Sequence, residues 1–174
     1  MRKYISFLLF AMIFTGVFCQ SDYLQRIDEL SDFYFSFDLN TIKLSILDAI
    51  RATGQKDVIA AYLDFVNNSP VWVVVTASSS IYVNPFTGRM NVSANSYLYR
   101  ISYPVSLEDA ISLAFVSGGR DIFFAFLQNQ SNWIIGTTKR LITVSTRAPV
   151  VISIQSRSNR GESSGSKKGE GTNR

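Results

Sequence analysis

The residue types that most often carry chemistry are scarce in this sequence. It contains no histidine, which argues against Ser-His and Cys-His nucleophiles and against zinc sites built on imidazole. Between residues 21 and 157 the only glutamates are Glu29 and Glu108, and neither falls in a recognisable catalytic pattern. Phosphate-binding glycine loops and clusters of metal-ligating residues are also missing from the sequence. We therefore predict no metal and no cofactor.

Three asparagines carry a pattern for covalent modification instead. Asn67, Asn91 and Asn129 each begin an Asn-x-Ser sequon, the acceptor sequence for N-linked glycans in secreted proteins. All three are therefore glycosylation candidates if the chain enters a secretory pathway.

The N-terminus predicts such a pathway. Arg2 and Lys3 precede an apolar run over residues 5–14, the arrangement of a secretory signal peptide, which we place at residues 1–20. This run is too short for a membrane span and no later stretch is long enough, so we expect a secreted mature chain without a membrane span. The single cysteine, Cys19, leaves with the signal, so the mature chain has no disulfide.

The formal charge of +4 is unevenly placed along the 174 residues. Basic and acidic residues balance between residues 21 and 157, while residues 158–174 are basic and rich in glycine and serine. Such a segment cannot bury enough apolar surface to fold, so we predict a disordered tail there. The sequence thus predicts one α+β domain over residues 21–157, with a mixed, largely antiparallel sheet and packed helices.

Hydrophobic spacing places the elements of that domain. Alternate apolar positions predict a strand over 33–39, running into an amphipathic helix over 42–50 that is capped by Asn40 or Thr41 and stopped by Gly54. Apolar residues on two sides predict a buried helix over 58–66. Ser106 and Asp109 form a capping box for a helix over 110–115. Strands are predicted over 71–75, 81–83, 97–103, 133–144 and 149–153, residues 122–127 fit a strand or a helix, and no internal repeat is evident.

Two blocks of this chain together resemble a known family. The first is residues 35–51, a strand that enters a helix through Asp38 and Leu39. The second runs from Ser80-Ile81-Tyr82-Val83 through residues 95–99 to the helix at 107–115. In this order they resemble the N-terminal half of ribosome-inactivating proteins, the rRNA N-glycosidases of the ricin A-chain and Shiga-toxin A-subunit type.

The resemblance implies an activity and two substrate-binding residues. These toxins remove an adenine from large-subunit rRNA. By position, Tyr82 matches the tyrosine that stacks on the target adenine, and Trp133, which follows Asn132, matches the second stacking ring. Aromatic stacking suits a base taken out of its helix, because every base offers a π-face. The resemblance would make the ribosome and its rRNA the partner.

The catalytic pair of that family is missing. It uses a Glu-Ala-Ala-Arg-type helix, with the carboxylate facing the sugar and the arginine facing the leaving adenine. Asn159 and Glu162 occupy the corresponding positions after residues 151–155, so the catalytic residues are unknown. Two hypotheses stay open: a truncated or degenerate ribosome-inactivating protein, and a secreted, catalytically inactive α+β module that binds a protein or a glycan.

Overall fold

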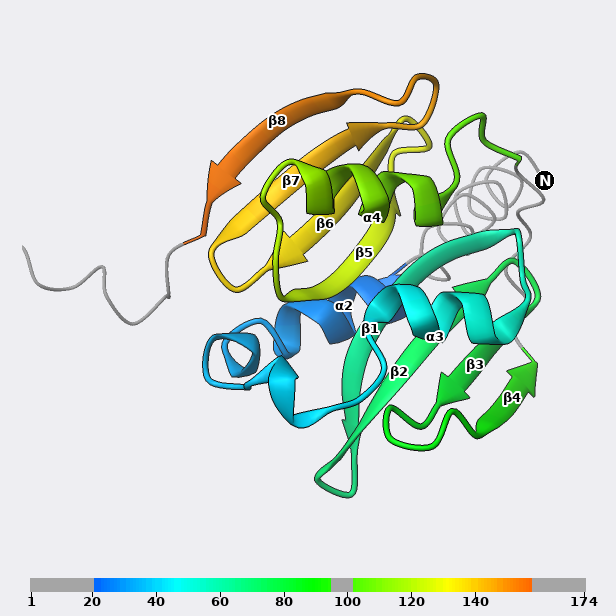
Figure 1. Ribbon diagram of the computed structural model, residues 1–174. Helices are drawn as coiled ribbons and strands as arrows, with labels where there is room; N and C mark the ends of the chain where they lie inside the picture. Colours follow the sequence, from blue (N-terminus) through cyan, green and yellow to red (C-terminus); the bar gives the residue numbers. More distant parts are fainter. Residues whose placement is uncertain (1–20, 95–101, 158–174) are drawn as a thin grey trace, which may run out of the picture.

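The computed structural model describes residues 21–94 and 102–157, which form one eight-stranded sheet with helices on both faces (Figure 1). The strand order is β4-β3-β2-β1-β5-β6-β7-β8, and every pairing is antiparallel. The α+β class is confirmed, with no parallel pair among these strands. The predicted signal peptide and tail lie outside the described residues, as does the expected strand from Tyr97 to residue 101.

The elements follow one another in a simple order. A first segment contains helix α2 (Ser21–Glu29) and two 3-10 turns, η1 (Phe33–Phe35) and η2 (Leu39–Thr41). Helix α3 (Ile46–Thr53) then leads into β1 (Val58–Val66), β2 (Ser69–Thr76), β3 (Ser79–Val83) and β4 (Met90–Ala94). Helix α4 (Leu107–Val116) leads in the same way into β5 (Ile122–Gln128), β6 (Asn132–Thr137), β7 (Arg140–Ser145) and β8 (Val151–Ser156).

This order is an internal repeat of one helix followed by a four-stranded meander. The two copies, which we call the first and second units, meet where β1 pairs antiparallel with β5. Helices α3 and α4 cover the same face of the sheet, α3 over β1 and β2 and α4 over β6 and β7 (Figure 1). The expectation of no repeat is therefore wrong.

The two units share their anchoring hydrogen bonds as well as their order. Trp72 donates its indole N–H to the carbonyl of Leu44 at 2.8 Å, and Trp133 donates to Val105 at 2.9 Å; each bond spans 28 residues. Each bond joins the second strand of a unit to the residue just before the cap of its helix. Thr76 and Thr137 also match, since each hydroxyl oxygen accepts backbone N–H groups of the turn that follows.

Both helices begin in the same way, at Ser-x-x-Asp. The hydroxyl of Ser45 accepts from the backbone of Asp48 while the Asp48 carboxylate accepts from the Ser45 N–H, and Ser106 and Asp109 repeat this capping box. The box satisfies N–H groups that have no partner within the helix. The predicted box at Ser106 and the stop at Gly54, which has φ 64, are confirmed. The cap of α3 is Ser45 rather than Asn40 or Thr41.

Two predicted elements are wrong. Residues 58–66 form strand β1, not a helix, because the strand lies at the centre of the sheet and is covered on both faces, which makes a continuous apolar run. Residues 33–39 form short 3-10 turns, not a strand. There Tyr34, between the predicted core positions, is the fully buried ring, whereas Phe33 is 42% exposed.

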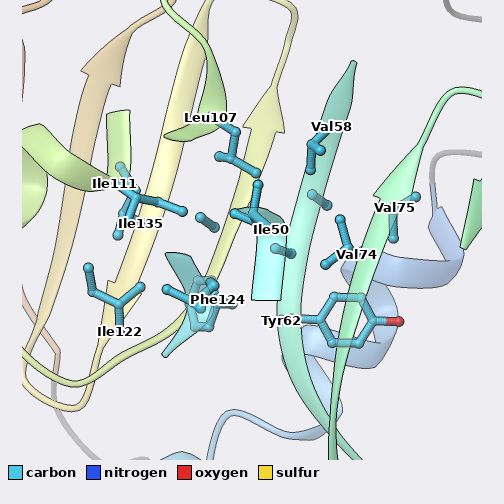
Figure 2. Packing of buried hydrophobic residues seen from close by; sticks show 14 of the residues in the cluster. Ile50, Val58, Tyr62, Val74, Val75, Leu107, Ile111, Ile122, Phe124 and Ile135 are labelled. Atoms are coloured by element: carbon cyan, nitrogen blue, oxygen red, sulfur yellow. The ribbon is translucent and has the colours of Figure 1, made fainter. Parts of the chain in front are cut away.

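The core lies mainly between the sheet and helices α3 and α4. Figure 2 shows Ile50 from α3 and Leu107 and Ile111 from α4 with the sheet residues Val74 and Ile135, all members of one buried cluster. Burial of these side chains supplies most of the favourable free energy of folding. The opposite face of the sheet carries α2 and η1, and a groove lies between them and the sheet.

Candidate functional site

A groove of about 780 Å³ lies between α2 with η1 and the second unit of the sheet. Ile134 lies between Trp133 and Ile135, whose side chains are buried under α4, so its own side chain points to the opposite face. One wall consists of apolar residues from β5, β6 and β7. The other comes from α2 and η1. The wall residues are Phe124, Phe126, Ile134 and Leu141 on the sheet, and Leu24, Ile27 and Phe35 opposite them.

Polar side chains surround this apolar interior. Thr143, Gln155 and Ser156 of β7 and β8 line the groove, with Gln128 and Asn129 at the end of β5. Asp28 and Asp32 line it from the helical side and are both exposed. Apolar walls combined with polar groups that can fix the orientation of a ligand are found in small-molecule sites.

Arg157 is the one cationic residue that lines the groove among the described residues. Its side chain donates to the carbonyl of Thr137, and its guanidinium carbon lies 4.9 Å from the ring centre of Phe35 and 5.4 Å from that of Phe124. Such stacking is a favourable cation–π contact. Burial lowers the pKa of Arg157, while Tyr34 and Asp32 raise it.

The helical wall is fixed to the sheet at two points. Arg26 of α2 donates to the carboxylate of Asp64 at the end of β1, with distances of 2.7 and 3.0 Å to one oxygen. That hydrogen bond is the main reason why the pKa of Arg26 is raised. Tyr34 donates its hydroxyl to the Leu63 carbonyl at 2.7 Å, and burial raises its pKa. The groove therefore has two walls held in place.

The two predicted stacking rings are not brought together. Tyr82 is half-buried on β3, and β2, β1 and β5 separate it from Trp133 on β6. The register places Tyr82 opposite Val73 and Trp72 opposite Val83, so Tyr82 lies on the face away from both tryptophans. Trp133 is 1% exposed and donates its N–H to Val105. Adenine stacking by either ring stays a prediction, and for Trp133 it would require opening of the core.

The asparagines of all three sequons are exposed. Asn67 and Asn129 sit in the tight turns after β1 and β5, with φ of 50° and 49°, and Asn91 lies on the edge strand β4. These positions are accessible to a modifying enzyme, so glycosylation at each stays a prediction. Asn129 also lines the groove, so a glycan there would stand at its entrance.

The two glutamates among the described residues take part in ion pairs. Glu29 pairs with Arg26 at 3.2 Å within α2, and Glu108 pairs with Arg51 at 2.6 Å, which joins α4 to α3. Neither lines the groove. Within residues 21–94 and 102–157 there is also no group of three or more side chains suited to hold a metal.

Comparisons with known proteins add little to this site. No protein-family model matches the chain, and no curated protein matches it. One solved structure, of a "putative lipoprotein" from Clostridium difficile, is 16% identical over 71% of this chain and 97% of that chain, with a TM-score of 0.35. A likeness this weak carries no argument. In the described part of the chain, no helix is long and apolar enough to cross a membrane.

Proposed function

We propose that the protein is a secreted binding module that holds a small molecule with an apolar body in the groove between α2 and the second unit. Secretion rests on the signal-like N-terminus of the sequence. Binding rests on one observation, an apolar groove of about 780 Å³ with a polar edge. That volume lies within the range of roughly 300–1,000 Å³ typical of ligand pockets.

The repeat supports this choice of face. Residues under the helices are conserved in kind between the units, as with Trp72 and Trp133 or Ile81 and Ile142. On the opposite face Val73 and Ile134 are alike, but two other matching pairs differ: Ser80 corresponds to Leu141, and Tyr82 to Thr143. Positions that the fold requires stay alike, so this difference fits a function carried by one unit.

On this face, one pair of facing residues differs between the two units in a compensating way. In the first unit Ala60 lies opposite Val75, and in the second unit Phe124 lies opposite Gly136. A methyl group on Gly136 would overlap the Phe124 ring. The large ring thus takes the space of the missing side chain, and its stacking with Arg157 brings it into the groove wall.

The test is a fluorescence titration with the neutral apolar dye N-phenyl-1-naphthylamine. Thr143→Trp adds a large ring to the groove wall, whereas Ser93→Trp makes the same kind of change on exposed β4. We expect the mature chain and Ser93→Trp to bind the dye and Thr143→Trp to lose at least tenfold in affinity. Equal binding by both folded variants would contradict the proposal.

Removal of adenine from rRNA remains the second proposal, because Tyr82 is half-buried rather than enclosed and lies on a strand. The reaction needs a catalytic carboxylate, and both glutamates of the described residues, Glu29 and Glu108, are in ion pairs. The measurement is adenine release from intact ribosomes by residues 21–174, with Tyr82→Ala alongside. Release that disappears in the variant would support it, and no release by the folded protein would remove it.

A further inference from the structure

We infer that the groove ligand is a monoanionic amphiphile, with a carboxylate or sulfonate head on Arg157 and an apolar tail on Phe126, Ile134 and Leu141. This inference rests on the proposed function. It goes further by naming the chemical class of the ligand and the residue that recognises it.

Arg157 has no ion-pair partner among the described residues. The ion pairs among the described residues join Arg26 to Glu29 and Asp64, and Arg51 to Glu108, so no described carboxylate lies within 4.0 Å of Arg157. Arg157 is nevertheless half-buried in the structure. A charge that is partly removed from water and has no counter-ion is unfavourable, and an anionic group that arrives there relieves the cost.

The contacts of Arg157 orient its N–H donors. The rings of Phe35 and Phe124 both lie close to the guanidinium carbon, and one N–H is used by the Thr137 carbonyl. A guanidinium has five N–H donors in one plane. The remaining donors, held by these contacts, suit the two oxygens of a carboxylate or sulfonate, which arginine binds in a bidentate manner.

An acidic side chain of the groove limits the ligand to one negative charge. The exposed carboxylate of Asp32 lines the groove from the helical side and acts on Arg157 through space without reaching ion-pair distance. A ligand with several anionic groups would bring some of them towards this carboxylate. A nucleic acid, which carries a phosphate at every nucleotide, is therefore disfavoured relative to an amphiphile with one acidic head.

The experiment compares two dyes that share an aromatic body. The anionic dye is 8-anilinonaphthalene-1-sulfonate and the neutral dye is N-phenyl-1-naphthylamine. Both are titrated into the mature chain, Arg157→Gln, Arg157→Lys, and the control Arg147→Gln, whose side chain is exposed and outside the groove. Thermal unfolding of each variant confirms that it is folded.

We expect Arg157→Gln to weaken the anionic dye at least tenfold more than it weakens the neutral dye, whose binding reports any change in the groove wall itself. Arg157→Lys should lose part of the anionic affinity, because it keeps the charge but not the planar fork. Equal losses for both dyes, or none, would overturn the assignment of the head group while the groove stands. If neither dye binds the mature chain, the inference falls with the proposed function.

Discussion

Replacement of either buried tryptophan by phenylalanine tests the repeat as an energetic unit. Trp72 and Trp133 are each 1% exposed, and each donates one hydrogen bond to the residue that precedes a helix cap. If the two units are built alike, Trp72→Phe and Trp133→Phe should destabilise the protein by similar amounts, and neither residue lines the groove.

The magnitude follows from what each change removes. Val105 is 3% exposed, so loss of the indole N–H leaves its carbonyl without that donor, at a cost of about 1–3 kcal/mol. The smaller ring gives up apolar burial and leaves a small cavity, which adds about 1 kcal/mol. The expected loss is therefore about 2–4 kcal/mol for Trp133→Phe. It should be at the lower end for Trp72→Phe, because Leu44 is only half-buried.

The assay is equilibrium unfolding in urea. The chain has two tryptophans, so each variant keeps one fluorescent reporter in the other unit. An unchanged dependence on urea would show that the change is in stability and not in the extent of unfolding. A loss below about 1 kcal/mol for Trp133→Phe would refute its role as a helix anchor.

Three further predictions concern single contacts. Gly136→Ala should cost about 2–3 kcal/mol of stability because its methyl group overlaps Phe124. The double variant Gly136→Val with Phe124→Ala, which reproduces the Ala60 and Val75 pair of the first unit, should recover stability. Thermal unfolding measures both. Ser106→Ala should cost about 1 kcal/mol by removing the cap of α4, and a loss of zero in urea unfolding would contradict that. Burial raises the pKa of Tyr34, so folding favours its protonated form; the stability this supplies is full below the usual tyrosine pKa of about 10 and is lost as pH rises above it. Between about pH 9 and 11 the free energy of unfolding should therefore fall less in Tyr34→Phe than in the unmodified protein. The same fall in both proteins would argue against this coupling.

Local signals in the sequence were sufficient where one residue type decides the conformation. The capping box at Ser106 and the stop at Gly54 both agree with the structure. Each depends on a side-chain oxygen or on a backbone angle that glycine adopts easily, so no distant contact is needed.

Signals that depend on distant contacts failed. The apolar run 58–66 fits a buried helix and a central strand equally well, and only its pairing with β2 and β5 decides between them. The repeat was not recognised in the sequence because the spacing between matching residues of the two units is not constant. The same number of residues separates Ser45 from Ser106 and Trp72 from Trp133, but three more separate Ala61 from Ala125.

The groove was missed for a similar reason. Its walls come from α2, η1 and four strands that are distant in sequence, and Arg157 gave no signal beyond its place at the end of the domain. One usable sign was present. Ile134 lies between two residues that face the helices, so alternation alone placed an apolar side chain on the opposite face.

The measurement that tests the account most directly is amide chemical-shift mapping of the mature chain with N-phenyl-1-naphthylamine. The repeat provides the internal control, since Val73 and Ser80 occupy in the first unit the positions of Ile134 and Leu141 in the second. We predict that the amides of Ile134 and Leu141 shift on titration while those of Val73 and Ser80 do not. Shifts confined to the first unit, or spread equally over both, would contradict the assignment of the groove.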